Sequence, residues 1–357
     1  MAAQQSIDEA LVEAFLGKAL VDTASAVVMV MASIGDRLGL FKHLASSPAT
    51  SEELARRAHV DERYAREWLS EMASAGYLEY DPESRSFTLP PEHAPVLAQE
   101  GGPFFFGGAY QLLMAQIGSY NQLLQAFQQG GGIPMEAYDP SLWEGMARFS
   151  AGFFEHQLVP VCLAAMPEVQ AKLERGALVA DVGCGQGRAL IKLAQSYPQS
   201  RYVGYDAFAP AVAAARANAE AAGVADHMRF ECLDVSEGLP QQYDVITTFD
   251  VVHDAVDPRR LLRAIRQGLR PGGRYVCLEA NGSDKLEENV GLIGSLLYGA
   301  SVLYCMTTSL AHHGAGLGTL ALSEKTLRAW CTEVGFSSVR RVPIELPFNA
   351  LYEITQL

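Results

Sequence analysis

Residues 178–188 read Leu178-Val-Ala-Asp-Val-Gly-Cys-Gly-Gln-Gly-Arg188, and this stretch decides the fold. An apolar run typical of a buried strand is followed by glycines at positions 183, 185 and 187, and a helical pattern then begins at once. Glycine lets the backbone approach a ligand closely, and the free N–H groups at a helix start face an anionic group. The stretch therefore predicts a strand, a tight turn and a helix that hold a nucleotide-like cofactor.

The spacing of these glycines narrows the choice of cofactor. A dinucleotide fingerprint needs glycine at position 188, and Arg188 stands there, which argues against a nicotinamide-dependent oxidoreductase. Asp181 precedes the first glycine by two residues, and a carboxylate there suits a ligand with a positive amino group, such as the methionine end of S-adenosylmethionine. A purely structural turn is the alternative. The residues assigned to this cofactor are Asp181, Gly183, Gly185 and Gly187.

The composition is that of an acidic globular protein. The chain has 357 residues, 49% of them hydrophobic, which suffices for a large core and suggests two domains. A net charge of −14 argues against nucleic acid or an anionic membrane as the main partner. The six cysteines show neither C-x-x-C pairs nor metal-ligand spacing, so reduced thiols and no bound metal are expected.

The N-terminal region bears on the location of the protein. Its first residues contain no basic segment leading into an apolar run, so no secretory signal is predicted. The longest apolar stretch, residues 24–34, is too short to span a bilayer. We therefore expect a cytoplasmic protein without membrane contact.

Residues 1–100 have the pattern of a winged-helix domain. Apolar residues recur at helical spacing, capping residues precede two short helices, and a turn signal separates two short strand-like runs. The expected elements are helices at 8–45, 51–58 and 61–75, followed by a hairpin of 77–80 with 85–89.

DNA binding is the obvious role of such a domain, but its charges oppose that role. Between Glu52 and Tyr80 the chain carries four arginines and seven acidic residues. A recognition helix with so many carboxylates would repel the phosphate backbone. We therefore expect the domain to form a homodimer. The alternative function of the protein is that of a ligand-responsive transcriptional regulator that retains a cofactor-binding fold.

The rest of the chain divides into a middle section, 101–175, and an α/β domain, 176–357. The middle section is rich in aromatic residues and glutamine, and is expected to form a helical linker that contributes to a substrate pocket. Strands then alternate with helices, which predicts a Rossmann-like, doubly wound, mostly parallel sheet of seven strands. The expected strands are 178–182, 201–205, 228–233, 243–249, 274–279, 339–344 and 350–355.

The ends of these strands carry further candidate cofactor residues, because ligands of such sheets bind beyond the carboxyl ends of the strands. Asp206 ends the second strand and can accept hydrogen bonds from both ribose hydroxyls of an adenosine ligand, or it can only cap the next helix. After the third strand, Asp234 is expected to bind the adenine amino group, with Val235 against the ring. Phe249, which closes the fourth strand, is assigned to the same cofactor.

Three candidate catalytic residues follow the fourth and fifth strands. Asp250 and His253 are expected in the ligand crevice, just beyond the core. A hydroxyl or thiol acceptor must lose its proton, and histidine, with an ordinary pKa of about 6.5, suits that task. Glu279 would orient the imidazole and stabilise its charged form. A loop histidine that only hydrogen-bonds to the backbone is the alternative.

Residues 284–322 are expected to form a lid between the fifth strand and the last helix. The apolar segment 289–308 favours a small or flat acceptor over a polypeptide. The glycines of residues 314–318 follow no strand, so they indicate a flexible part of the lid and not a second nucleotide loop. The adjacent His312 and His313 predict no metal site, because neighbouring side chains diverge.

On these motifs the chain resembles class I S-adenosylmethionine-dependent methyltransferases with an N-terminal winged-helix dimerisation domain. It is similar both to plant-type small-molecule O-methyltransferases and to a related bacterial group. The resemblance rests on the glycine loop, on Val252-His-Asp254, on Leu269-Arg-Pro-Gly-Gly273 and on Leu310-Ala-His312. In the family, the histidine of the His-Asp pair is the base and a glutamate orients it, which implies these roles for His253 and Glu279.

The chain departs from the family pattern at two positions. It lacks the acid that the family places after Leu-Ala-His, and Ala255 stands where the family commonly has tryptophan. The resemblance nevertheless implies transfer of a methyl group from S-adenosylmethionine to a small-molecule acceptor by in-line displacement. A hydroxyl is the first choice of acceptor and a thiol the second.

Overall fold

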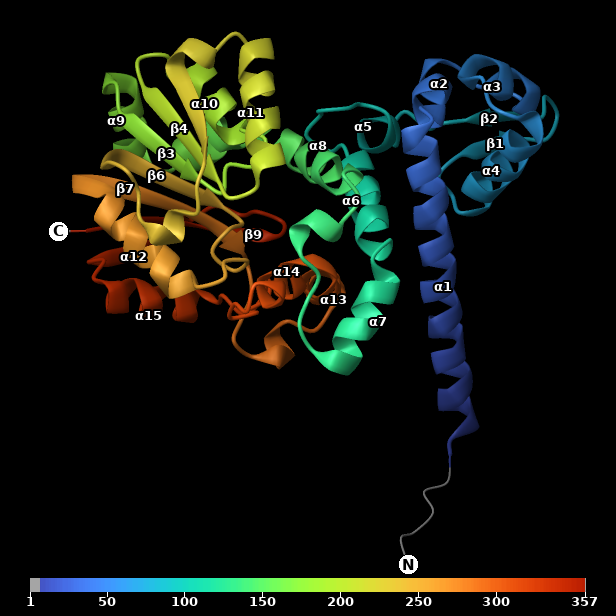
Figure 1. Ribbon diagram of the computed structural model, residues 1–357. Helices are drawn as coiled ribbons and strands as arrows, with labels where there is room; N and C mark the ends of the chain where they lie inside the picture. Colours follow the sequence, from blue (N-terminus) through green and yellow to red (C-terminus); the bar gives the residue numbers. More distant parts are fainter. Residues whose placement is uncertain (1–6, 357) are drawn as a thin grey trace, which may run out of the picture. The chain divides into compact units, whose positions relative to one another are not determined.

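The computed structural model describes residues 7–356, which divide near residue 114 into two compact units. Figure 1 shows the order of the elements along the chain, with the N-terminal unit in blue and the sheet of the second unit in green to red. The sequence predicts three sections, 1–100, 101–175 and 176–357, and their boundaries at residues 100 and 175 remain a prediction. Each unit is described by itself below.

The first unit opens with a long helix, α1 (Glu9–Arg37), capped by the side chain of Asp8. The expected helix over residues 8–45 is in fact broken, because Gly39 adopts a left-handed conformation with φ of 68°. The chain resumes as α2 (Leu40–Ser46). Glycine tolerates this conformation without the steric cost that a side chain would bring.

The predicted winged-helix pattern is confirmed. Thr50 and Glu53 form a capping box at the start of α3 (Ser51–Ala58), and Asp61 caps α4 (Glu62–Ser74). The wing is the antiparallel pair β1 (Glu79–Asp81) and β2 (Ser86–Thr88), followed by α5 (Ala94–Leu97). In the core of this first unit, Phe41 packs against Trp68, with ring centroids 5.1 Å apart. Leu54, Leu69 and Met72 are fully buried there.

The first half of α1 has no packing partner among the described residues of its own unit. Its large apolar side chains, including Leu11, Phe15 and Leu16, are exposed. By length and composition α1 could cross a membrane, as could the helical segment Leu292–Ala311, a third of which is buried. The expectation that no apolar segment is long enough was therefore wrong. Such helices are also found in protein interfaces and cores, so this feature alone does not decide the location.

The second unit begins with helices that lead to the sheet. The boundary lies within α6 (Gly107–Ile117), and the structure then has α7 (Tyr120–Gln129), α8 (Ser141–His156), a π-helical segment at Leu158–Leu163 and α9 (Pro167–Arg175). The remaining helices are α10 (Arg188–Ser196), α11 (Ala209–Ala221), α12 (Pro258–Gly268), α13 (Leu292–Ala300), α14 (Met306–Ala311) and α15 (Glu324–Val334).

The seven-stranded sheet confirms the predicted fold class. Its order is β5-β4-β3-β6-β7-β9-β8, with parallel pairing from β5 to β7 and antiparallel pairing of β9 with both neighbours. The strands are β3 (Leu178–Val182), β4 (Arg201–Asp206), β5 (Met228–Cys232), β6 (Tyr243–Phe249), β7 (Leu269–Ala280), β8 (Ser338–Arg341) and β9 (Asn349–Thr355). Strand β7 already starts at the predicted Pro-Gly turn, where its register with β6 shifts.

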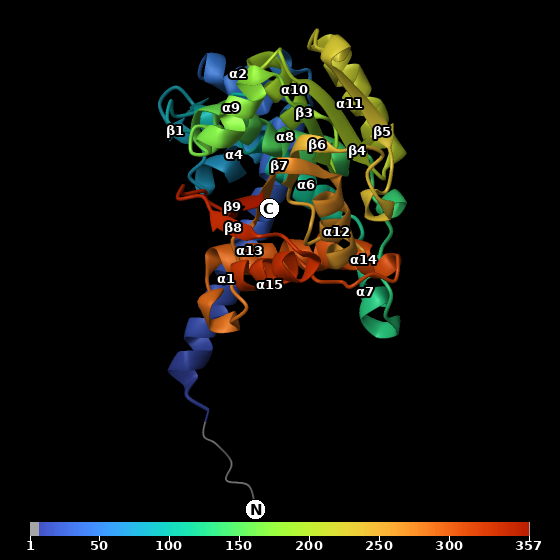
Figure 2. The same ribbon diagram turned by 90° about the vertical axis from the view of Figure 1, so that its left-hand side faces the viewer.

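Helices cover both faces of this sheet (Figure 2). One apolar core lies between the sheet and α9, α10 and α11, and a second lies between the sheet and α12 and α15. The inward side chains of the strands are fully buried, as a parallel sheet with two covered faces requires. At one edge of the sheet, Asp206 ends β4, and Asp181 and Glu279 lie one residue before the ends of β3 and β7.

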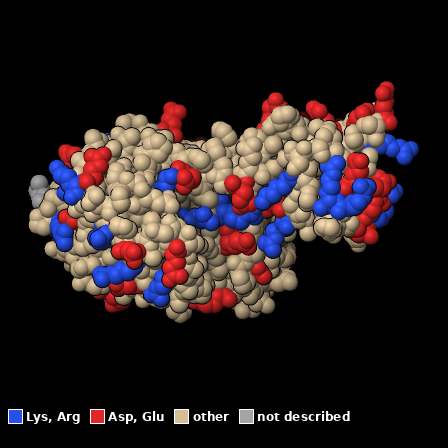
Figure 3. Space-filling view, turned by 90° about the horizontal axis from the view of Figure 1, so that it is seen from above, with Lys and Arg blue, Asp and Glu red and all other residues tan. Residues whose placement is uncertain are grey.

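Charged residues of both signs are interspersed over the face shown in Figure 3. On α4, Arg66 pairs with Glu62 and Arg63 with Glu67, so arginines of the expected recognition helix are matched by carboxylates within one turn. This pattern leaves little positive charge for a nucleic-acid backbone.

Candidate active site

The glycine loop forms the tight turn that its sequence predicts. Gly183, Gly185 and Gly187 all have positive φ, at 70°, 51° and 78°. A Cβ atom at Gly183 would lie 2.5 Å from Val251, and one at Gly187 would lie 2.7 Å from the Phe230 ring. Both the conformation and the space therefore require glycine at these two positions.

Asp206 fixes this loop from the neighbouring strand. Its Oδ2 accepts a hydrogen bond from the Gly185 N–H and its Oδ1 accepts one from the Phe208 N–H, both at 2.9 Å. Burial raises the pKa of this carboxyl, while the two backbone donors lower it. Each oxygen keeps a second lone pair, so the carboxylate can still accept hydrogen bonds from a ligand.

Asp181 lies deeper, at the end of β3. It is almost fully buried and accepts a hydrogen bond of 2.6 Å from the Thr247 hydroxyl. Burial raises the pKa of Asp181 to about 7; Thr247 opposes this shift and the charge of Asp206 adds to it. Two acidic side chains thus lie at neighbouring strand ends, where a cation would stabilise their ionised forms.

Asp234, which follows β5, makes local hydrogen bonds. Asp234 is exposed, and its Oδ1 accepts hydrogen bonds from the backbone N–H and the hydroxyl of Ser236, which caps a short turn. Val235 is buried in the core formed with α12. Phe249 lies half-buried at the end of β6 and packs edge-on against Phe154, with centroids 5.3 Å apart.

Glu279 and His253 are in direct contact, as expected. The His253 Nδ1 atom lies 2.6 Å from Glu279 Oε2, and the two residues are 3% and 1% exposed. The other carboxylate oxygen accepts hydrogen bonds from the backbone N–H groups of Val251 and Val252, at 3.2 and 2.7 Å. One buried carboxylate therefore holds both the imidazole and the loop that carries it.

Asp254 and Cys305 lie on the opposite side of the imidazole. His253 Nε2 is 3.0 Å from Asp254 Oδ1, and ligand atoms of His253, Asp254 and Cys305 all lie within 4.8 Å of one another. Burial by itself would lower the pKa of His253, but the charges of Asp254 and Glu279 outweigh it and hold that pKa well above 6.5. Sequence reasoning quoted Asp254 within a motif but assigned it no role, and it missed Cys305.

Asp250 adopts a left-handed conformation with φ of 56°, which is uncommon for a residue other than glycine. The Asn349 side chain, from β9, donates a hydrogen bond of 2.7 Å to its Oδ1. Loss of hydration raises the pKa of Asp250 to about 7, and the negative charge of Glu279 adds to this shift. Backbone strain of this kind clusters at functional sites.

Aromatic residues from α8 and the lid complete the surroundings. Trp143 packs against Phe208, the residue that follows the Asp206 turn, with ring centroids 4.6 Å apart. Tyr304 meets the rings of Tyr138 and Trp143 edge-on at 5.5 and 6.0 Å. The sequence indicated that the aromatic-rich section 101–175 contributes to a pocket, but tertiary packing decides which of its rings meet the lid.

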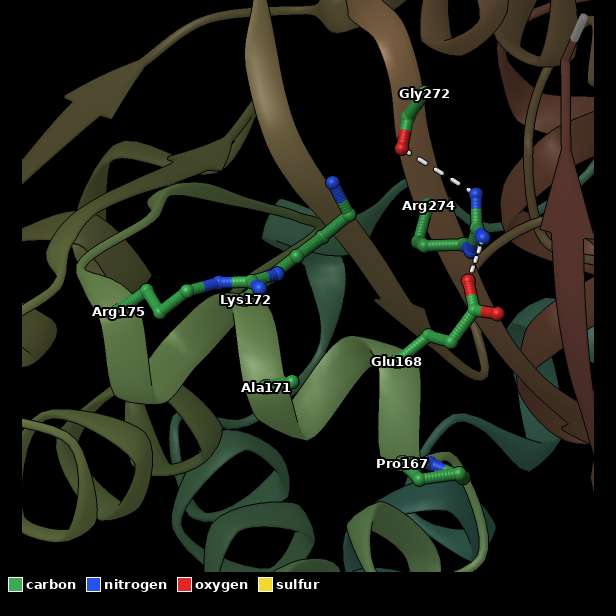
Figure 4. Close-up of a pocket in the computed structure, with 7 residues that line it drawn as sticks. All are labelled: Pro167, Glu168, Ala171, Lys172, Arg175, Gly272 and Arg274. Atoms are coloured by element: carbon green, nitrogen blue, oxygen red, sulfur yellow. Dashed lines mark hydrogen bonds and ion pairs between the residues drawn. The ribbon is translucent and has the colours of Figure 1, made fainter.

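A hollow of about 420 Å³ lies elsewhere, between α9 and the start of β7 (Figure 4). Lys172, Arg175 and Arg274 line it, and Arg274 pairs with Glu168 across it. Arg274 is near the amino end of β7 and Glu279 near its carboxyl end, so this hollow is at the opposite edge of the sheet from His253. It is therefore separate from the candidate active site.

Replacement of Glu279 by glutamine should lower the pKa of His253, because a neutral amide no longer stabilises the imidazolium. In the wild type, the stability from the protonated ring is complete below the unfolded pKa of about 6.5 and is lost as the pH rises through the raised folded pKa. The variant should lose this stability at lower pH. An NMR titration of the His253 ring, with urea unfolding at several pH values, measures both effects; an unchanged pKa would contradict the assignment.

Comparisons with known proteins agree with the two units. Residues 26–99 match the model of the Rv2258c-like winged HTH domain, and residues 180–275 match that of a methyltransferase domain. A ubiquinone biosynthesis O-methyltransferase of Roseobacter denitrificans is 29% identical over 158 residues, 44% of this chain and 59% of that protein. The chain spans between 23% and 59% of the length of the first curated relatives that it matches.

Solved structures share the fold over nearly the whole chain. Mitomycin 7-O-methyltransferase aligns with a TM-score of 0.70 at 19% identity, covering 98% of this chain and 100% of that one. An O-methyltransferase of neocarzinostatin biosynthesis, in complex with S-adenosylhomocysteine and 1,4-dihydroxy-2-naphthoic acid, aligns over both full chains with a TM-score of 0.67 at 18% identity. The chain is thus similar to an Rv2258c-like winged helix-turn-helix domain over residues 26–99 and to a methyltransferase domain over residues 180–275, and it shares the fold of solved O-methyltransferases.

Proposed function

We propose that the protein transfers the methyl group of S-adenosylmethionine to a hydroxyl or thiol of a small molecule. One observation carries the proposal: within the methyltransferase domain, the Asp206-held glycine loop and the Glu279–His253 pair stand at the same edge of the sheet. The first suits an adenosine ligand and the second suits an acceptor that must lose a proton.

The proposed cofactor site uses residues that the fold already holds in place. Asp206 would accept hydrogen bonds from the ribose hydroxyls, and Asp181 would attract the amino group of the methionine end. Asp234 has one carboxylate oxygen outside its Ser236 bonds, which could accept from the adenine amino group. When bound, S-adenosylmethionine supplies an electrophilic methyl group on a positively charged sulfur.

His253 is proposed as the base that takes the proton of the acceptor. Glu279 fixes the ring through Nδ1, so Nε2, which lies 3.0 Å from Asp254 Oδ1, is the nitrogen proposed to take the proton. The raised pKa of this imidazole makes the neutral ring a stronger base than a free histidine. Asp254 and Asp250 would stabilise the imidazolium that forms, and the site would mainly align donor and acceptor.

The acceptor is proposed to be flat and aromatic. The aromatic rings of Trp143 and Tyr138, which both pack against the lid residue Tyr304, would line the site for such a molecule. The neocarzinostatin enzyme is bound to a dihydroxynaphthoic acid, and that likeness supports the same class of acceptor here. A hydroxyl is favoured over a thiol because a base is more important for the less acidic group.

The N-terminal unit is proposed to form a homodimer through α1. The exposed apolar side chains along this helix are the reason, since monomers rarely leave such a surface open. A DNA-binding regulator is disfavoured by the paired charges on α4. The protein is proposed to act in the cytoplasm.

Asp206→Ala tests the cofactor site. We expect calorimetric titration of the wild type with S-adenosylhomocysteine to show micromolar binding, weakened at least about tenfold in the variant, since a hydrogen bond to a charged group contributes about 1.5–3 kcal/mol. Asp226→Ala, an exposed acid outside the proposed site, is the control. A folded, ligand-free wild type that does not bind would refute the proposal.

His253→Gln tests the base. Methyl transfer to a dihydroxynaphthalene should fall by about 10²–10⁴-fold, the usual contribution of a general base, while S-adenosylhomocysteine affinity stays within about twofold. The wild-type rate should also rise with pH towards the raised pKa of His253. Full activity of the variant would show that His253 is not the base.

Leu16→Glu with Leu20→Glu tests the dimer. Light scattering coupled to size exclusion should give twice the chain mass for the wild type and a single chain mass for the variant, because two charges cannot enter an apolar interface. Both side chains are exposed, so the monomer fold should be unchanged in circular dichroism. A wild type that is monomeric at micromolar concentration would contradict the proposed role of α1.

A further inference from the structure

The lid contains a π-helical turn at Ser301–Cys305, between α13 and α14. Its wider winding changes the direction of successive side chains, and such turns recur at functional sites. Here Cys305 lies against His253 and Asp254, while the preceding Tyr304 turns its ring towards Trp143 and Tyr138. The turn thus brings two consecutive side chains to the candidate active site.

Tyr304 is held in place with its hydroxyl unused. The residue is only 8% exposed, and two aromatic edges flank its ring. Tyr138, one of these neighbours, donates a hydrogen bond of 2.7 Å to the Leu303 carbonyl, which ties it to the same turn. Among residues 7–356, no hydrogen bond of the Tyr304 hydroxyl is found, so packing and not a polar anchor sets the orientation of the ring.

The position of Tyr304 is defined by two carboxylates. The next residue, Cys305, has its sulfur within 4.8 Å of a carboxylate oxygen of Asp254. Trp143, which meets the Tyr304 ring, also packs against Phe208, whose N–H donates a hydrogen bond to Asp206. Burial, and after it the charges of both carboxylates, raise the pKa of Tyr304 well above its usual value. Asp206 marks the ribose end of the proposed cofactor site, and Asp254 touches the proposed base. Under the proposed function, the methyl group would pass from the cofactor to the acceptor in the region between these two carboxylates.

We propose that the ring of Tyr304 holds the sulfonium end of S-adenosylmethionine and so positions the methyl group for transfer. The inference rests on the proposed function. A neutral tyrosine ring has a negative face that attracts an organic cation, and burial strengthens this attraction. The interaction distinguishes the cofactor from its product, because S-adenosylhomocysteine has a neutral sulfur. Tyr304 would therefore favour binding of the donor and release of the spent cofactor.

The test compares the dissociation constants of S-adenosylmethionine and S-adenosylhomocysteine by calorimetry, for the wild type, Tyr304→Leu and Tyr304→Phe. In Tyr304→Leu, affinity for S-adenosylmethionine should fall about tenfold and affinity for S-adenosylhomocysteine by no more than about twofold. Tyr304→Phe keeps the ring and should retain both affinities. Tyr298→Leu, on the exposed part of the lid, should change neither.

The other outcomes separate the possible failures. Equal losses for both ligands in Tyr304→Leu, or no loss at all, would overturn the role of the ring, and so would a loss in Tyr304→Phe as large as in the leucine variant. If Tyr304→Leu does not fold, Tyr304→Met, which fills similar space without a π face, replaces it in the same comparison. A wild type that binds neither ligand would refute the proposed function itself, whereas binding with an unchanged affinity ratio would refute only this inference.

Discussion

The candidate site depends on one buried negative charge, the carboxylate of Glu279. A carboxylate that is 1% exposed must find donors within the protein, and Glu279 finds three: two backbone N–H groups and the imidazole of His253. Satisfying this charge fixes the loop after β6. Asp250, at the start of the loop, takes up its left-handed conformation there, with Asn349 of β9 as its support. The antiparallel end of the sheet is thereby connected to the chemistry at its parallel centre.

The sequence predicted the parts of this molecule that follow local rules. The strands β3, β4, β6 and β7 contain apolar runs, and Asp206 and Glu279 could be placed because the carboxyl ends of parallel strands meet at one edge of a sheet. The break at Gly39 was missed since the helical apolar spacing continues across it. Tyr304 and Cys305 were missed for a different reason. They belong to an apolar lid segment whose π-helical turn, set by tertiary packing, decides which side chains face the site.

The N-terminal unit has a winged-helix fold, but its surface charges do not suit DNA binding, the obvious role of that fold. The helices and wing follow the winged-helix plan, and the core around Trp68 and Leu69 is closed. The surface, however, pairs its arginines with glutamates on the same helix. A row of exposed apolar side chains lies along α1. What such a domain contacts is therefore determined by side chains that the fold leaves free, and not by the fold itself.

The thiol of Cys305 illustrates a problem that an alkylating site has to solve. Sulfur in its ionised form is among the best nucleophiles in a protein, and here it lies beside the proposed path of a reactive methyl group. Burial and the charge of Asp254 raise the pKa of Cys305 to about 11, so the sulfur stays protonated at neutral pH. A protonated thiol attacks carbon poorly. The carboxylate next to the imidazole thus has a second effect, in that it protects the protein against modification of its own side chain.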